Sequence, residues 1–185
     1  MLTFERLKWQ TRYGAQEPPQ RIAVIGNAGG GKTTLSRKLS KIYQLPLTHV
    51  DSHQFTANMQ IRPHHETISI LKDIQVQSHW VIDGFGPLDI LLDRLEQADL
   101  IVFVDLPLWR HVWWSALRQL KNLIWPRQEL PLDCQKITWA QTTRLMASIW
   151  KTHQKMRPEL IRILYRPSLH PKLIHLQKTS DLKID

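Results

Sequence analysis

A glycine-rich segment near the N-terminus constrains the fold more than any other feature of the sequence. The segment consists of Gly26, Asn27, Ala28, Gly29, Gly30, Gly31, Lys32, Thr33 and Thr34. It follows the β-branched run Arg21–Ile25 and begins Lys32–Tyr43, where apolar residues recur at helical spacing. The pattern fits G-x-x-x-x-G-K-[ST] between a strand and a helix, which is the context that this motif requires. The sequence therefore predicts a phosphate-binding loop.

The residue types of this loop suit the binding of a nucleotide. Glycines allow successive backbone N–H groups to converge on phosphate oxygens, and the start of the following helix adds the positive end of its dipole. We expect the Lys32 ammonium to reach the β- and γ-phosphates and the Thr33 hydroxyl to bind Mg²⁺. Binding of ATP or GTP with Mg²⁺ is the resulting prediction. The alternative, a chance glycine-rich turn, is disfavoured by the flanking strand and helix.

Apolar runs and helical patterns alternate along the rest of the chain. Strands are predicted at 21–25, 47–50, 79–82, 100–104 and 173–176, and helices at 32–43, 66–76, 88–97, 108–124, 137–155 and 158–165. This alternation predicts an α/β fold of three layers, with a mostly parallel five-stranded sheet between helices. A length of 185 residues suits one domain. We assign residues 21–185 to it and residues 1–20, which end in Glu17-Pro18-Pro19, to an N-terminal extension.

Three aspartates each follow an apolar strand, namely Asp51, Asp83 and Asp105. In a parallel sheet their side chains would emerge at the same edge as the phosphate loop, where ligands bind. Each could also be an ordinary turn or helix cap. Because three carboxylates share one edge, we expect at least one of them to hold Mg²⁺ or its water ligands.

Several of these segments occur together in one known group of proteins. They are the phosphate loop with Thr33-Thr34, the strand Pro46–Asp51, Trp80–Gly84, Ala98–Pro107 and the Trp- and Arg-rich stretch Leu108–Leu120. With them the chain resembles the adenylate-kinase-like branch of P-loop kinases, and within it the DNA topology modulation proteins and their related adenylate kinases. The resemblance implies ATP-Mg²⁺ as phosphoryl donor and the Walker B role, binding of Mg²⁺ together with Thr33, for Asp83.

The same resemblance implies roles for three more parts of the chain. Asp51 would face the phosphoryl acceptor, where it could act as general base if the acceptor is a hydroxyl. The helix Leu108–Lys121 would lead into a helical lid at about residues 123–137 that closes arginines over the phosphates. From the basic face of that helix we take Arg118, with Arg110 or Arg127, as the clamp on the triphosphate and as a catalytic residue with Lys32 and Asp51. The alternative is that this basic face is simply solvated. The segment Gln177–Thr179, with Lys178, is where such kinases hold the adenine.

One departure from adenylate kinases concerns the acceptor. Those enzymes follow Asp-Gly-Phe with Pro-Arg, and that arginine grips the acceptor phosphate, whereas Gly86 and Pro87 follow Phe85 here. Arg62 and Arg94 are the candidates to replace it. AMP is therefore not implied as the acceptor.

The positive charge is confined to the C-terminal part of the chain. Residues 1–108 contain 11 Lys and Arg and 11 Asp and Glu, whereas residues 109–185 contain 14 and 5, which accounts for the whole net charge of +9. The predicted helix 108–124 combines an apolar stripe, expected in the core, with a basic face. The stripe contains Trp113, Leu117, Leu120 and Ile124, and the basic face contains Arg110, Trp114, Arg118 and Lys121. This charge predicts an anionic partner, which could be a phosphorylated small molecule, nucleic acid or a membrane surface.

We therefore expect a kinase that transfers phosphoryl from ATP-Mg²⁺ to a nucleotide, nucleoside or similar small acceptor. Two alternatives remain: a nucleotide-dependent nucleic-acid-binding protein that uses the basic C-terminal half, and a simple NTPase. The longest apolar run, Leu100–Val104, is too short to span a membrane. The single cysteine, Cys134, fits a reducing cytoplasm. The sequence leaves the oligomeric state open.

Overall fold

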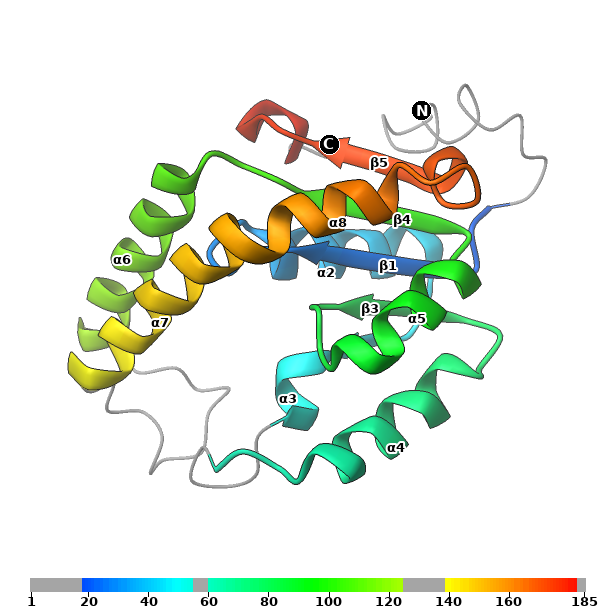
Figure 1. Ribbon diagram of the computed structural model, residues 1–185, viewed down its shortest axis with the longest axis horizontal. Coiled ribbons are helices and arrows are strands. Elements are labelled where there is room, and N and C mark those ends of the chain that lie inside the picture. Colours follow the sequence, from blue (N-terminus) through cyan, green and yellow to red (C-terminus); the bar gives the residue numbers. More distant parts are fainter. Residues whose placement is uncertain (1–17, 55–59, 125–138, 183–185) are drawn as a thin grey trace.

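The computed structural model describes residues 18–54, 60–124 and 139–182. Within them the strands form one parallel sheet of order β2-β3-β1-β4-β5, with β1 in its centre (Figure 1). The strands are β1 (Arg21–Gly26), β2 (Leu47–His49), β3 (Trp80–Asp83), β4 (Leu100–Val104) and β5 (Leu173–Leu176). The five-stranded α/β fold predicted from the sequence is confirmed, and every strand pairing in it is parallel.

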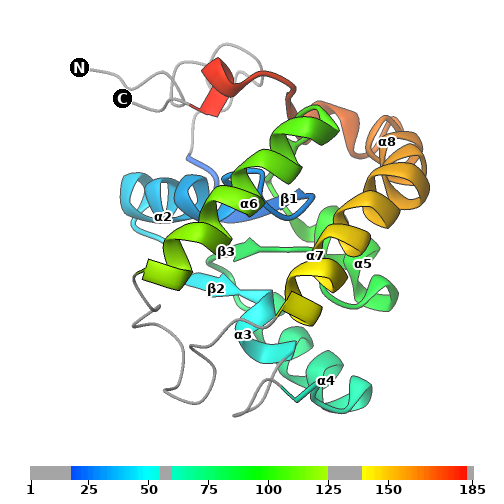
Figure 2. The same ribbon diagram turned by 90° about the vertical axis from the view of Figure 1, so that its left-hand side faces the viewer.

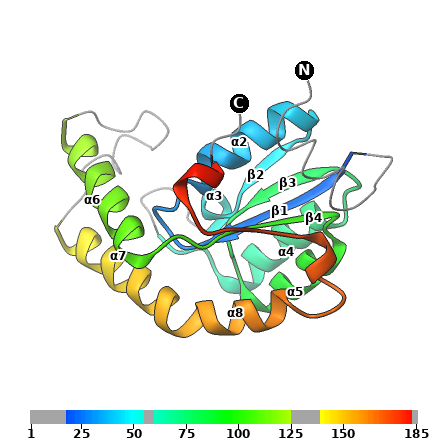
Figure 3. The same cartoon turned by 90° about the horizontal axis from the view of Figure 1, so that it is seen from above.

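Helices cover both faces of the sheet, as Figure 3 shows, with α2 on one side and α5 and α8 on the other. The helices are α2 (Lys32–Tyr43), α3 (Val50–Gln54), α4 (His64–Gln75), α5 (Leu91–Gln97), α6 (Leu108–Ile124), α7 (Trp139–Lys151) and α8 (Arg157–Leu164). Alternate residues of one strand enter different cores: Ile22 and Val24 pack on the α2 side, and Ala23 and Ile25 pack on the other. Burial of both faces explains why β1 reads as a continuous apolar run.

Two helical segments differ from the expectation. Val50, expected to be the last residue of the strand 47–50, instead begins the short helix α3, so that Asp51 lies in its first turn. The helix predicted at 137–155 ends as α7 at Lys151 and continues as a π-helical turn, Thr152–Met156, directly into α8. Pro158 is in the first turn of α8, where its missing N–H is tolerated.

The expected orientation of α6 is wrong. Trp113 and Leu120, predicted to be core residues, are 56% and 58% exposed, and Leu117 is 37% exposed. The buried side of α6 instead contains His111 and Ser115, which contact the phosphate loop. Periodicity shows that a helix has an apolar face, but it does not show on which side the core lies. The loop presents backbone carbonyls, and these require a donor such as His111 rather than an apolar side chain.

Helices α6 and α7 form the outer side of the molecule beside the phosphate loop (Figure 2). Most of the predicted lid, residues 125–137, lies outside the described residues, as do residues 1–17 of the predicted extension, the side chain of Lys121 and that of Ile124. No helix in the described ranges is long and apolar enough to cross a bilayer.

Candidate functional site

The phosphate loop runs from the end of β1 to the start of α2 at the carboxyl edge of the sheet (Figure 1). Gly29 and Gly31 have φ values of 71° and 82°, a backbone conformation that a residue with a Cβ rarely adopts. A Cβ on Gly29 would also overlap the Ser115 hydroxyl and the His111 carbonyl of α6. The glycines therefore allow both the curl of the loop and the close approach of α6.

Two side chains attach the loop to the neighbouring helices. Asn27 Oδ1 accepts a hydrogen bond from the Ala28 N–H (2.8 Å). Its Nδ2 donates a hydrogen bond to the carbonyl of Ile149 in α7 (2.8 Å). His111 of α6 donates from Nδ1 to the Ala28 carbonyl (2.9 Å). Burial lowers the pKa of His111, with further lowering by Lys32 and His153, so the ring is neutral near pH 7. The sequence motif identified Asn27 only as a loop position and did not identify His111.

The predicted catalytic residues lie close enough to influence one another electrostatically. The Lys32 ammonium donates to the carbonyl of Asn27 (2.8 Å). Burial lowers the pKa of Lys32, Asp83 and Asp51 oppose this lowering, and Arg118 adds to it. The charge of Lys32 therefore responds to Asp83 at the end of β3, to Asp51 in α3 and to Arg118 in α6.

Thr33 and Asp83 provide oxygen ligands of the kind that Mg²⁺ prefers. The Thr33 hydroxyl donates to Asp83 Oδ2 (3.0 Å), and Asp83 Oδ1 is buried without a hydrogen-bond partner. Among the residues that the structure describes, no cluster of three or more His, Cys, Asp or Glu could hold a metal. One hydroxyl and one carboxylate fit Mg²⁺, because this ion keeps water ligands and takes further oxygens from phosphates. Asp83 Oδ1, which has no hydrogen-bond partner, is the carboxylate oxygen that remains for Mg²⁺.

His49 belongs to this site, although no sequence motif identified it. Its Nδ1 lies 3.0 Å from Asp83 Oδ2, the oxygen that also accepts from Thr33. His49 ends β2, and the parallel register places it directly beside Asp83. In the sequence, only its position two residues before Asp51 indicated that His49 could lie near the site. The register between β2 and β3 is what identifies Asp83 as its partner.

Asp51 is exposed at the junction of β2 and α3, and its Oδ1 lies beside Gly84. The positive φ of Gly84, 116°, turns the chain sharply after β3 and keeps this space free of a side chain. The Asp51 carboxylate is therefore open to solvent, and its charge acts on Lys32.

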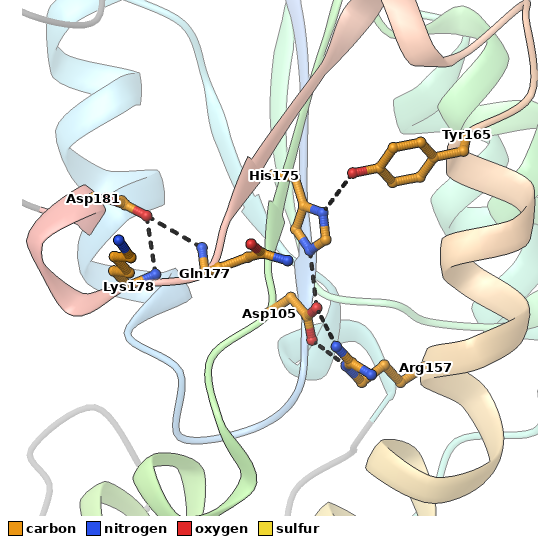
Figure 4. A network of polar contacts seen from close by, with 7 residues as sticks. All are labelled: Asp105, Arg157, Tyr165, His175, Gln177, Lys178 and Asp181. Carbon is orange, nitrogen blue, oxygen red and sulfur yellow. Dashed lines mark hydrogen bonds and ion pairs between the residues drawn. The ribbon is translucent and has the colours of Figure 1, made fainter.

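Asp105, the third strand-end carboxylate, is fully engaged within the protein (Figure 4). It accepts from Arg157 Nε (2.6 Å) and Nη2 (2.9 Å) and from His175 Nε2 (2.9 Å), and His175 Nδ1 accepts from the Tyr165 hydroxyl (3.0 Å). Burial would raise the pKa of Asp105, but the hydrogen bonds from His175 and Arg157 hold it below its ordinary value. Asp105 therefore has no oxygen left for a metal, so this carboxylate is not the metal ligand expected at the sheet edge.

Both arginines considered as a replacement grip for an acceptor phosphate form bonds within the protein. Arg94 is fully buried and donates from Nη1 to the carbonyls of Gly84 (2.9 Å) and Phe85 (3.1 Å). Burial lowers its pKa to about 10. Arg62 donates to the carbonyl of His53 (3.0 Å) and lies 3.4 Å from Glu66. The expectation for Arg94 is therefore wrong: this side chain supports the turn after β3.

Lys178, predicted to contact the base of the nucleotide, is exposed in the turn that follows β5. Asp181 accepts the backbone N–H groups of Lys178 (2.9 Å) and Gln177 (3.2 Å) and so fixes this turn (Figure 4). Leu182, which follows, packs with Trp114 of α6 in the α2-side core, and both lie close to Gly31. The turn, α6 and the phosphate loop are therefore neighbours.

The strand order, the loop after the central strand and the position of Asp83 together define the P-loop kinase fold. The structure is similar to shikimate kinase from Acinetobacter baumannii in complex with shikimate, with a TM-score of 0.51 and 15% identity over 90% of this chain and 87% of that chain. Two further matches are shikimate kinases from Bacteroides thetaiotaomicron (TM-score 0.47, 15% identity, 84% of this chain and 94% of that one) and Aquifex aeolicus (0.43, 15%, 76% and 98%). No protein-family model matches the sequence, and a search of curated proteins found no relative. At this identity the likeness shows the fold.

Proposed function

We propose that this protein is a kinase that transfers the γ-phosphoryl group of ATP-Mg²⁺ to a hydroxyl of a small molecule. The observation that carries the proposal is the phosphate loop held by α6 and α7, with the Lys32 ammonium inside it and the Thr33 hydroxyl bonded to Asp83. The charges of Asp51 and Arg118 act on Lys32. Phosphoryl transfer is catalysed mainly by positioning and by neutralisation of charge, and these residues supply the groups for both. The similarity to the P-loop kinase fold supports the same class of reaction.

The loop amides and the Lys32 ammonium would hold the β- and γ-phosphates, with Lys32 leaving the Asn27 carbonyl to do so. Thr33 and Asp83 would hold Mg²⁺, which when bound supplies positive charge to the phosphate oxygens. Arg118, on the same side of α6 as the loop contacts, would stabilise negative charge on the transferred group with its forked donors. Lys178 and its turn would lie beside the base.

A hydroxyl acceptor fits this site better than a nucleoside monophosphate. A phosphate acceptor calls for a cation to bind it, whereas Arg94 is buried in a structural role and Arg62 is bonded to His53. A hydroxyl calls for a base, and the exposed Asp51 provides one. In the transfer, the acceptor oxygen forms the new P–O bond, its proton passes to the Asp51 carboxylate, and ADP leaves.

The proposal is tested by ADP release in the presence of ATP and Mg²⁺ over a panel of nucleosides, sugars, hydroxy acids and nucleoside monophosphates. Shikimate, the ligand of the Acinetobacter kinase, belongs in that panel. We expect a hydroxyl compound to give a product heavier by one phosphoryl group. Lys32→Ala should abolish this product, whereas Lys72→Ala, an exposed lysine on α4, should not. Product from no acceptor, or from monophosphates alone, contradicts the proposal.

The variant Asp51→Asn tests the role of Asp51 as general base independently of ATP binding. We expect turnover with the hydroxyl acceptor to fall ~10²–10⁴-fold, the usual contribution of general base catalysis. ATP affinity, measured by calorimetry, should stay near that of the wild type because Asp51 does not belong to the loop. Unchanged turnover would show that the acceptor proton leaves by another route.

A further inference from the structure

The side of α6 that faces away from the phosphate loop is apolar. His111 and Ser115 face the loop, and a row of apolar side chains lies on the opposite side of the helix. We name this row the α6 apolar face, and its members, with their exposed fractions, are Trp109 (60%), Val112 (39%), Trp113 (56%), Leu117 (37%) and Leu120 (58%).

The α6 apolar face is continuous along the helix. Positions 109, 113, 117 and 120 are separated by four, four and three residues, so they form one stripe about 16 Å long. Single exposed apolar residues are ordinary on soluble proteins, but a contiguous row of large ones marks a surface that binds something apolar. The two tryptophans make this surface suited to an interface between an apolar and an aqueous phase.

The charged residues of α6 and α7 have one sign. The two helices contain no Asp or Glu, and their basic residues are Arg110, Lys121, Arg144 and Lys151, besides Arg118 on the loop side of α6. On α7, Arg144 and Lys151 are exposed, as is Trp150, which is 59% exposed. Helices α6 and α7 form the same outer side of the molecule (Figure 2), and their exposed residues include tryptophans, aliphatic side chains and cations.

An anionic lipid bilayer complements this combination better than other partners do. Single-stranded nucleic acid would stack on the tryptophans but would leave Val112, Leu117 and Leu120 against polar groups. A second copy of the chain would bring two sets of cations together, which is unfavourable. At a bilayer surface the aliphatic side chains enter the acyl region, tryptophans lie at the headgroup level, and arginine and lysine bind lipid phosphates.

We propose that the α6 apolar face docks the protein onto a bilayer that contains anionic lipids, with Arg144 and Lys151 of α7 beside the headgroups. The helix lies in the plane of the interface and does not cross it. The inference is independent of the proposed kinase activity, because none of the five residues of the face contributes a group to phosphate or metal binding.

Flotation with phosphatidylcholine vesicles, with or without phosphatidylglycerol, tests the proposal on the full chain. We expect binding to the vesicles that contain phosphatidylglycerol and weak binding to the others. Trp113→Ser with Leu120→Ser should lower the partition coefficient roughly thirtyfold, because about half of each side chain's burial energy is lost. The matched control is Val76→Ser with Leu88→Ser, which removes two exposed apolar side chains (73% and 59%) at the end of α4 and just before α5, and should leave binding unchanged.

A second pair of variants tests the electrostatic part. Arg144→Ala and Lys151→Ala should each lower binding about fivefold at low salt, and added salt should remove this difference. Quenching of wild-type tryptophan fluorescence by brominated phosphatidylglycerol provides a readout that needs no variant. We expect strong quenching, since Trp109 and Trp113 would lie at the headgroup level.

Four results would overturn the proposal. The first is that the protein does not bind phosphatidylglycerol vesicles, and the second is that both double variants lose binding equally. The third is that the protein binds single-stranded DNA but not vesicles. The fourth is a wild-type dimer that binds no vesicles and that the Trp113 and Leu120 substitutions convert to monomer. Circular dichroism and thermal unfolding of each variant check that it folds, as exposed positions lead us to expect.

Discussion

Two buried aspartates on either side of the central strand have opposite environments. Asp83 ends β3 and Asp105 follows β4, the two strands that flank β1, and each residue is 6% exposed. Both oxygens of Asp105 are bonded, by Arg157 and His175. In Asp83, Oδ2 accepts from Thr33 and lies beside His49, whereas Oδ1 has no partner.

The difference separates a carboxylate that stabilises the fold from one that is prepared for a ligand. Asp105 joins β4 to α8 and β5, so its charge is compensated inside the protein. A buried carboxylate oxygen without a partner costs free energy. Such a residue is expected where function requires the open oxygen. The comparison predicts that the two residues respond to substitution in opposite ways.

The largest expected effect is on catalysis, from Asp83→Asn. A metal contributes several kcal/mol to the stabilisation of charge in the transition state, and each 1.36 kcal/mol is a factor of ten in rate. We therefore expect kcat for ADP formation to fall ~10²–10³-fold, while the free energy of unfolding in urea changes by less than about 1 kcal/mol. Wild-type turnover in this variant would remove Asp83 from the metal site.

Asp105→Asn should affect mainly stability. Loss of the ionic bonds to Arg157 and His175 should lower the free energy of unfolding by about 2 kcal/mol, measured by urea denaturation. The lowered pKa of Asp105 gives the sign of the acid dependence. The contribution of the Asp105 charge to the free energy of unfolding is fully present above pH 3.8, the ordinary pKa of the group. It is lost as the pH falls through the lower pKa of the folded state. A larger loss of turnover than in Asp83→Asn would reverse the comparison.

His49→Ala tests whether the bond to Asp83 positions the metal ligand. Loss of such a supporting bond typically weakens metal binding 10–100-fold, so we expect the Mg²⁺ concentration for half-maximal turnover to rise about tenfold. The value of kcat at saturating Mg²⁺ should change little. His65→Ala, at an exposed histidine of α4, is the matched control. Equal Mg²⁺ dependence in the two variants would assign His49 a purely structural role.

The smallest expected effect is the pH dependence due to His111. Its pKa is below 6.5 in the folded state, so on acidification the unfolded chain binds a proton before the folded protein does. The contribution of neutral His111 to the free energy of unfolding is therefore fully present above about pH 6.5. It falls as the pH decreases toward the pKa of His111 in the folded state. His111→Gln keeps a donor for the Ala28 carbonyl but does not titrate. Its free energy of unfolding should decline about 1 kcal/mol less than that of the wild type between pH ~7.5 and ~5.5. Parallel curves would contradict this role.

The features that the sequence predicted are the ones that local patterns determine. The run of β1, the helix α2 and the spacing of Lys32 and Thr33 follow from short-range periodicity and one motif, and the structure places them as expected. The contact of His49 with Asp83 depends on the register between β2 and β3, which no single strand encodes. The burial of Arg94 and the exposure of Trp113 likewise depend on which elements pack together. Sequence patterns assign a face to a helix, whereas its orientation is a property of the whole fold.

The bond between Asn27 and Ile149 has a consequence for the order of events during synthesis of the chain. The motif of the phosphate loop is complete at Thr34, but the carbonyl that holds Asn27 lies 122 residues further along the sequence, and the α6 residues that seat Gly29 also come later. Contacts between residues so far apart in sequence form late. A nascent chain that carries the entire motif therefore still lacks the seated loop until α7 has left the ribosome.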